Sequence, residues 1–227
     1  MPWIQSYQVE QDIILTKALV QIYSDPHLKD AFAFRGGTSL QKIFFSSPTR
    51  YSEDIDLVQV RTEPIGESID ALRRLMDSWL GKPGVDFKTA RCTLKYKFLS
   101  KEAPQRQMRL KIEINTGEHF NVLGLKKSNF EMQSSWYSGK CEILTNDKKM
   151  VDCFLEYMKH GNITVSRAEF ESNLHKKLND RVFMEDIKPL LKPDAPDFNI
   201  AEQGELVKTR TLSLLPGDPW KGEPKNK

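Results

Sequence analysis

The sequence contains 227 residues, enough to bury a hydrophobic core as one large domain or as two small ones. Apolar residues make up 39% and charged residues 29%, a balance that excludes a disordered chain and is typical of a soluble globular protein. The net charge of +3 permits a nucleic-acid partner without requiring one.

Localisation signals are missing from the sequence as it stands. No apolar run approaches the roughly 20 residues that a membrane span needs, so we expect no membrane partner. The first residues lack the basic and apolar regions of a signal peptide, and we expect a cytoplasmic protein. Cys92, Cys141 and Cys153 show no metal-ligand spacing and are expected to be reduced thiols, and the scattered histidines do not indicate a zinc site.

The first half of the chain mixes helical and strand periodicities. Apolar residues there recur either at the spacing of a helix or at the spacing of a strand. In chain order, these periodicities predict a helix at 9–23, a buried strand at 31–34, a helix from Thr38, a strand at 54–60 and a helix at 67–80. Two alternating segments joined by a polar loop then predict a hairpin, with strands at 87–99 and 110–115.

From residue 150 onward the apolar spacing becomes helical. Helices are predicted at 151–158, 170–178 and 182–191, and the tail after Pro216 is rich in Pro, Gly and Lys. This order of elements predicts an α+β protein. We place a mixed α/β domain at residues 1–130 and a mainly helical domain with a flexible tail at 131–227.

One specific chemical signal is a glycine turn followed by two aspartates. Strand side chains alternate, so Asp54 and Asp56 share one face, and such a carboxylate pair is suited to a hard cation, Mg²⁺ or Mn²⁺. The turn supplies backbone N–H groups at the start of a helix, where a triphosphate binds well. Its residues are Gly36, Gly37, Thr38 and Ser39. We therefore predict metal-dependent nucleotidyl transfer from an NTP, with Asp54 and Asp56 binding the metal.

Three further charged residues are candidates for the same site. Glu113 points away from the apolar residues of its predicted strand, which makes it either a third catalytic carboxylate or a solvated glutamate paired with Lys111. Lys42 lies one helical turn after Thr38, and is either a phosphate ligand or a solvated helix lysine. Arg50 precedes the aspartate strand and is a candidate to neutralise the triphosphate charge.

The predicted hairpin is basic. Its cations are Lys88, Arg91, Lys95, Lys97, Lys101, Arg106, Arg109 and Lys111. Because phosphate contacts dominate nucleic-acid affinity, the hairpin is a candidate RNA platform, with Lys95, Lys97 and Arg109 as the residues in contact. The alternative is a solvated strand face with core aromatic residues behind it.

Two segments, Phe34–Lys42 and Arg50–Leu57, resemble the AbiEii/AbiGii toxin family, nucleotidyltransferase-like proteins of bacterial toxin–antitoxin and phage-defence systems. The resemblance implies a polymerase-β-like palm with a helical C-terminal part. It implies that Asp54 and Asp56 hold the metal and that the Gly36–Ser39 turn cradles the triphosphate. It also implies cytoplasmic action, an antitoxin encoded nearby and, for some members, nucleotide addition to tRNA.

The sequence departs from the family pattern between residues 145 and 152. Relatives continue there with a helix that leads into an Arg-Asp motif, whereas this chain passes through Lys148 and Lys149 to Asp152. We expect an enzyme that transfers a nucleoside monophosphate from an NTP to RNA such as tRNA. The alternatives are a catalytically weakened nucleotide-binding module and a nucleotidyltransferase that acts on a small molecule.

Overall fold

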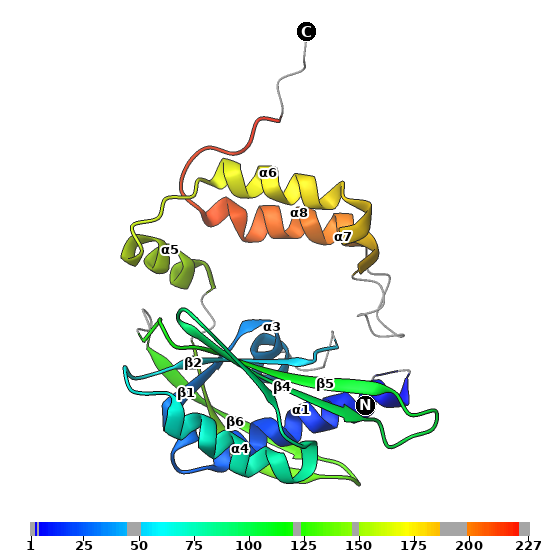
Figure 1. The fold of residues 1–227 in the computed structure, drawn as a ribbon. Helices are drawn as coiled ribbons and strands as arrows, with labels where there is room; N and C mark the ends of the chain where they lie inside the picture. The colour runs from blue at the N-terminus through cyan, green and yellow to red at the C-terminus, as the bar shows by residue number, and fades with distance from the viewer. Residues whose placement is uncertain are drawn as a thin grey trace. The chain divides into compact units, whose positions relative to one another are not determined.

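The computed structural model describes residues 3, 5–44, 51–119, 124–146, 150–186 and 199–222. The chain forms two compact units, residues 1–147 and 148–227, and each is described by itself (Figure 1). The first unit is a mixed sheet with helices and the second is helical. The predicted α+β class is therefore confirmed.

The first unit contains the two long helices that the sequence predicts. Helix α1 spans Ser6–Ser24 and helix α4 spans Gly66–Leu80, where Gly81 ends it with a positive φ of 78°. A short helix α2 (Leu28–Ala31) precedes the first strand. After that strand, the glycine turn begins helix α3 (Gly36–Ser39), which continues as the π-helical turn η1 (Leu40–Phe44).

Within the described residues, the sheet has seven strands in the order β3-β4-β5-β2-β1-β7-β6. Their bounds are β1 Phe32–Arg35, β2 Asp54–Gln59, β3 Gly84–Lys88, β4 Arg91–Leu99, β5 Gln107–Asn115, β6 Leu125–Gln133 and β7 Ser138–Asn146. Strand β2 lies between β1, which is antiparallel to it, and β5, which is parallel to it. Strands β4 and β5 form the predicted hairpin, although residues 87 and 88 of its first predicted strand belong to β3, which pairs with β4.

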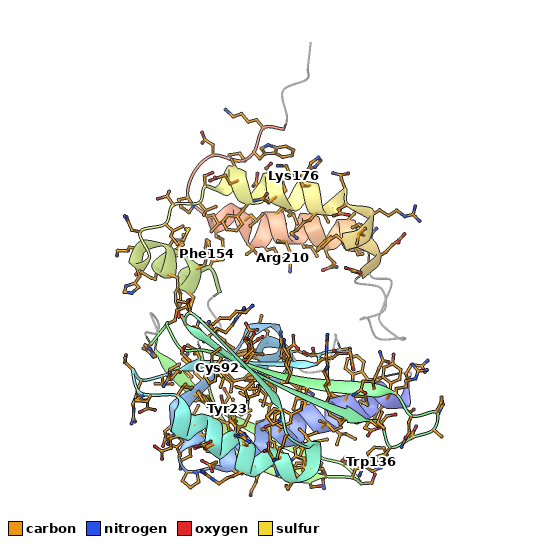
Figure 2. The ribbon with its side chains drawn as sticks, in the orientation of Figure 1. Tyr23, Cys92, Trp136, Phe154, Lys176 and Arg210 are labelled. Atoms are coloured by element: carbon orange, nitrogen blue, oxygen red, sulfur yellow. The ribbon has the colours of Figure 1, made fainter. Side chains whose placement is uncertain are left out.

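Helices α1 and α4 cover one face of this sheet (Figure 1). Alternate residues of the strands point into the core on that face, among them Ile55, Leu57, Leu94 and Ile112, all at most 1% exposed. Burial of each such side chain stabilises the fold by about 1.5–3 kcal/mol. Tyr23 and Cys92 belong to the same core (Figure 2). The other face carries the charged residues of β2, β4 and β5, and we call it the open face.

The sheet extends beyond the domain boundary predicted from the sequence. The boundary between residues 130 and 131 falls inside β6, and both β6 and β7 belong to the first unit. Among the described strands, β6 pairs only with β7 at the sheet edge, and most of its residues are at least partly exposed. Its sequence therefore lacks the apolar alternation by which a half-buried strand is recognised.

The described part of the second unit contains α5 (Met150–His160), α6 (Arg167–Leu178), α7 (Arg181–Asp186), α8 (Ile200–Arg210) and the 3₁₀ turn η3 (Leu212–Leu214). These helices confirm the predicted helical pattern, although residues 187–191 of the last predicted helix lie outside the described part. Phe154 of α5 packs edge-to-face on Phe170 of α6 at 5.2 Å (Figure 2). Gly204 lets α8 approach Leu178 so closely that a Cβ there would overlap it.

Two general expectations can be compared with the described residues. Cys92 and Cys141 are free thiols, as predicted for them. Among the described helices, none combines the length and the apolar character that a membrane crossing requires.

Candidate active site

Three carboxylates meet in the middle of the open face. Strands β2 and β5 pair so that Asp54 lies opposite Lys111 and Asp56 lies opposite Glu113. Side chains alternate along both strands, and Ile55 is fully buried between the two aspartates. Asp54, Asp56 and Glu113 therefore share one side of the sheet.

The charges of this cluster act strongly on one another. Burial, together with the neighbouring charges of Asp54 and Glu113, raises the pKa of Asp56. The Lys111 Nζ lies 3.0 Å from Asp54 Oδ2 and 3.6 Å from Glu113 Oε2. Burial alone would lower the pKa of Lys111, but its hydrogen bond to Asp54 and the nearby carboxylates outweigh burial and raise it. Arg91 Nη1 also lies 3.3 Å from Glu113 Oε1.

The chemistry of these side chains fits Mg²⁺ or Mn²⁺. Asp54 and Asp56 offer hard oxygen ligands on one face, and the raised pKa of Asp56 reflects its burial and the neighbouring negative charges, which a bound cation would offset. In the part of the chain that the structure describes, no group of three or more His, Cys, Asp or Glu side chains is arranged to hold a metal ion. Glu113 is instead paired with Lys111 and Arg91, as the alternative interpretation of this residue predicts.

The glycine turn lies directly against Asp56. Gly36 has a φ of +79°, and a Cβ at this position would overlap the Asp56 carboxylate. Both facts require glycine here. The Thr38 hydroxyl makes a short contact with the Ser52 hydroxyl, and Ser39 Oγ donates to the Phe34 carbonyl at 3.2 Å. Both side chains are buried, so the turn presents backbone rather than hydroxyl groups.

A cleft of about 550 Å³ opens beside this turn, and we call it the Arg35 cleft. It is lined by Arg35, Gly36, Asp56, Leu57, Thr89, Ala90, Arg91, Glu113 and Asn115. Arg35 pairs with Glu118 at 2.6 Å, and its register partner across β1 and β2 is Asp56. The sequence reasoning missed Arg35, for which the only signal was its place immediately before the glycine turn.

The other predicted phosphate ligands are placed differently. Lys42 Nζ bonds to Asp12 Oδ1 at 2.5 Å and to Thr16 Oγ1 at 3.1 Å, and its side chain is 9% exposed. This contact holds Lys42 against α1, so we leave it out of the proposed site. Arg50 lies outside the described residues.

The predicted RNA ligands lie on the open face of the β4–β5 hairpin. Lys97 is the register partner of Arg109, and Lys95 is that of Lys111. All three predicted ligands, Lys95, Lys97 and Arg109, are exposed. Tyr96 between the two lysines is fully buried, so core aromatic packing accompanies the basic face here.

The segment that departs from the family pattern, residues 145–152, runs from the end of the first unit into the second. Thr145 in β7 pairs with Phe34 in β1, and the Thr145 hydroxyl lies 3.3 Å from the Ser39 hydroxyl. Lys148 and Lys149 fall outside the described residues. Asp152 lies in the first turn of α5, in the second unit.

Residues 17–147 match the family described as "Nucleotidyl transferase AbiEii toxin, Type IV TA system". The chain belongs to the AbiEii family. The resemblance seen in the sequence is thereby confirmed, and the match covers β1, the glycine turn and β2. Membership makes the protein a nucleotidyltransferase-family toxin of a type IV toxin–antitoxin system, which implies an NTP substrate and an antitoxin partner.

Solved structures with low sequence identity share the fold. A putative nucleotidyltransferase from H. pylori is 13% identical, with 93% of this chain and 95% of that chain covered and a TM-score of 0.55. JHP933 from Helicobacter pylori is 12% identical, with 93% of each chain covered and a TM-score of 0.54.

MenT4, a nucleotidyltransferase toxin from Mycobacterium tuberculosis H37Rv, is 16% identical with a TM-score of 0.48. The match covers 75% of this chain but only 58% of the length of MenT4. No curated protein matches the sequence.

Proposed function

We propose that this AbiEii protein transfers a nucleoside monophosphate from an NTP to a hydroxyl group of RNA, such as tRNA, and releases pyrophosphate. The observation that carries the proposal is the contact of the Gly36 backbone with the Asp56 carboxylate at the edge of the Arg35 cleft. A phosphate-binding turn and a metal-binding carboxylate must be adjacent in such a site, because a metal held by the carboxylate would stabilise the charge of the phosphates.

In this proposal the Arg35 cleft holds the triphosphate. The first N–H groups of a helix have no intrahelical acceptor, so those of the Gly36–Ser39 turn are available to the β- and γ-phosphates. Arg35 and Arg91 line the cleft and neutralise phosphate charge. Asp54 and Asp56 would hold Mg²⁺ or Mn²⁺, which when bound supplies charge stabilisation at the reacting phosphate.

The reaction itself is an in-line displacement. The acceptor oxygen forms a bond to the α-phosphorus, the bond from that phosphorus to the bridging oxygen breaks, and the hydroxyl proton passes to solvent. The protein contributes mainly positioning and charge neutralisation, so no side chain needs to form a covalent intermediate.

The test is label transfer. Purified protein is incubated with Mg²⁺ and each labelled NTP in turn, with and without total bacterial RNA. We expect label on RNA with the unmutated protein and a loss of at least about a hundredfold with Asp56→Ala. Asp70→Ala is the matched control, because Asp70 is an exposed aspartate on α4. Full transfer by Asp56→Ala would refute the metal assignment.

A second candidate is a nucleotide-binding module without turnover. It is favoured by the pairing of Lys111 with both Asp54 and Glu113, which places a protein cation among the carboxylates. This candidate predicts NTP binding with no labelled product on prolonged incubation. A small-molecule acceptor instead predicts that charge reversal at Lys95 and Lys97 leaves the transfer rate unchanged.

A further inference from the structure

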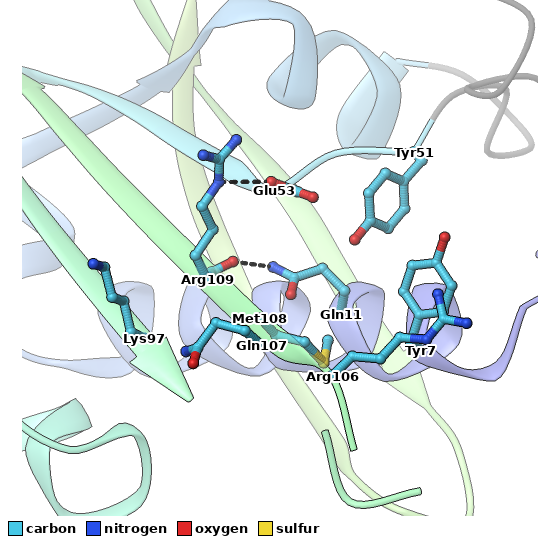
Figure 3. A pocket seen from close by; sticks show the side chains of 9 residues that line it. All are labelled: Tyr7, Gln11, Tyr51, Glu53, Lys97, Arg106, Gln107, Met108 and Arg109. Atoms are coloured by element: carbon cyan, nitrogen blue, oxygen red, sulfur yellow. Dashed lines mark hydrogen bonds and ion pairs between the residues drawn. The ribbon is translucent and has the colours of Figure 1, made fainter. Parts of the chain in front are cut away.

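A second cleft opens on the same face, on the other side of the carboxylates. It has a volume of about 550 Å³, and we call it the Tyr51 cleft (Figure 3). Its lining residues are Tyr7, Gln11, Tyr51, Glu53, Lys97, Arg106, Gln107, Met108 and Arg109. Along β5, Arg109 lines this cleft and Glu113 lines the Arg35 cleft, with Lys111 between them. Four residues of strand correspond to about 13 Å, so the two clefts flank the carboxylates.

The Tyr51 cleft combines cations with aromatic rings. The guanidinium of Arg106 lies 4.7 Å from the centre of the Tyr7 ring. Arg109 Nε lies 2.8 Å from Glu53 Oε2, while the Arg109 side chain stays 71% exposed. Lys97 has no ion-pair partner among the described residues, and the rings of Tyr7 and Tyr51 stand at the same end of the cleft (Figure 3).

The walls of this cleft are held in place by the core around them. Gln11 Nε2 of α1 donates to the Arg109 carbonyl at 2.8 Å, which joins α1 to β5. The Glu10 carboxylate accepts the Lys101 N–H at 3.0 Å, at the tip of the hairpin. Trp3, itself 7% exposed, packs edge-on against Tyr51 with ring centres 6.0 Å apart. The cleft is therefore built from ordered contacts and not from exposed lysines alone.

The geometry of the reaction assigns this cleft a ligand. In an in-line displacement the attacking hydroxyl and the leaving pyrophosphate lie on opposite sides of the α-phosphorus. If the triphosphate occupies the Arg35 cleft, the acceptor approaches from the side of Arg109. A cationic groove with aromatic side chains is the usual surface for single-stranded nucleic acid, because cations bind phosphates and rings stack on bases.

We infer that the Tyr51 cleft binds the terminal nucleotides of a single-stranded acceptor, and this inference rests on the proposed function. Lys97, Arg106 and Arg109 contact the phosphates, and Tyr51 stacks on a base. Glu53 orients Arg109, because it accepts a hydrogen bond from the Arg109 Nε, and its charge, after burial, raises the pKa of Tyr51. It also immediately precedes Asp54, which joins the cleft to the carboxylates.

The test measures binding of a fluorescein-labelled single-stranded oligouridylate of about ten nucleotides. The variant Lys97→Glu/Arg106→Glu is expected to weaken binding at least about tenfold and to lower the salt dependence by roughly one unit per lost phosphate contact. The control is Lys82→Glu/Lys140→Glu, with the same change in net charge at exposed lysines outside both clefts. We expect less than about a twofold effect from it. Equal weakening by both variants, or no oligonucleotide binding by the unmutated protein, would overturn the assignment.

The stacking contact has its own test. Tyr51→Leu is expected to weaken oligouridylate binding about tenfold, while Tyr51→Phe keeps the ring and the affinity. NTP binding, measured on the same variants, is expected to stay unchanged because Tyr51 does not line the Arg35 cleft. A variant that loses NTP binding as well has lost its fold and is replaced by Lys97→Glu alone.

The two proposals fail in different ways. Cleft-dependent oligonucleotide binding without label transfer from any NTP would refute the proposed function and leave the cleft assignment standing. Label transfer to RNA with the same KM for the Lys97→Glu/Arg106→Glu variant would refute the cleft assignment and leave the proposed function standing.

Discussion

The two faces of the sheet are built from the same strands and differ in almost every other respect. On the covered face, residues such as Ile55, Ile112 and Ile114 are fully buried against the helices. On the open face, their neighbours Asp56 and Glu113 form a cluster in which burial and like charge raise the pKa of Asp56. Adjacent residues of one strand therefore serve stability and chemistry separately, because the pleat directs them to opposite sides.

The largest expected effect comes from a pair of charged residues that is buried, as an exception to this division. Lys42 of η1 forms an ion pair with Asp12 of α1. Lys42→Ala would leave Asp12, whose side chain is 8% exposed, without its cation. We expect a loss of about 4 kcal/mol in the free energy of unfolding, measured by urea denaturation. Removal of both charges in Asp12→Asn/Lys42→Met should restore most of that loss. If Lys42→Ala lowers the free energy of unfolding by less than about 1 kcal/mol, water solvates the Asp12 charge in place of Lys42.

The next effect concerns two adjacent residues of β5. Ile112→Ala removes a fully buried side chain and is expected to cost about 3 kcal/mol, which lowers the melting temperature by roughly 10 °C. Glu113→Gln changes the neighbouring residue on the open face, and its melting temperature should stay within about 2 °C of the parent. Thermal unfolding followed by circular dichroism compares them directly, and equal shifts would contradict the division between the faces.

The local part of this division could be predicted from the sequence. Alternation in residues 54–60 was enough to place Asp54 and Asp56 on one side, and the glycine pair marked the turn before the helix. The side of a strand on which a residue lies follows from the two-residue period of side chains, and a tight turn follows from its glycines. Both features depend only on residues that are close in sequence.

The long-range part could not be predicted from the sequence. Glu113 lies opposite Asp56 only because β2 and β5 pair in parallel, and nothing near either residue encodes that register. For Lys42 the sequence allows a phosphate ligand or a solvated helix lysine, and nothing near this residue indicates its partner Asp12, which lies thirty positions earlier on another helix. Tyr51 carried no signal, since a tyrosine before a strand is common and its cleft is formed by residues distant in sequence.

A smaller effect is expected in the dependence of activity on pH, on the acid side of the profile, where the ionisation of the open face is tested. Asp56 has to be ionised to hold a metal, and its pKa is raised, so transfer should be lost as the pH falls through that raised pKa. Lys111 is one of the cations that lower the pKa of Asp56. Lys111→Met is therefore expected to move the acid limb toward higher pH, and Lys111→Arg to leave it in place. If the acid limb of the pH–activity profile is the same in Lys111→Met as in the parent, the ionisation of Asp56 does not limit activity.

The smallest expected effect is a gain in stability at the site itself. The pKa of Asp56 is raised in the folded state, so this carboxylate favours folding while protonated, and that contribution is lost as the pH rises through the folded pKa. Asp56→Asn removes the charge with little change of shape, and we expect its melting temperature at neutral pH to rise by roughly 2 °C while transfer is lost. The difference should vanish at acid pH, where Asp56 is protonated in both states. A lower melting temperature for Asp56→Asn at neutral pH would mean that contacts of the charged carboxylate, such as those with the Gly36 turn, outweigh the repulsion from Asp54 and Glu113.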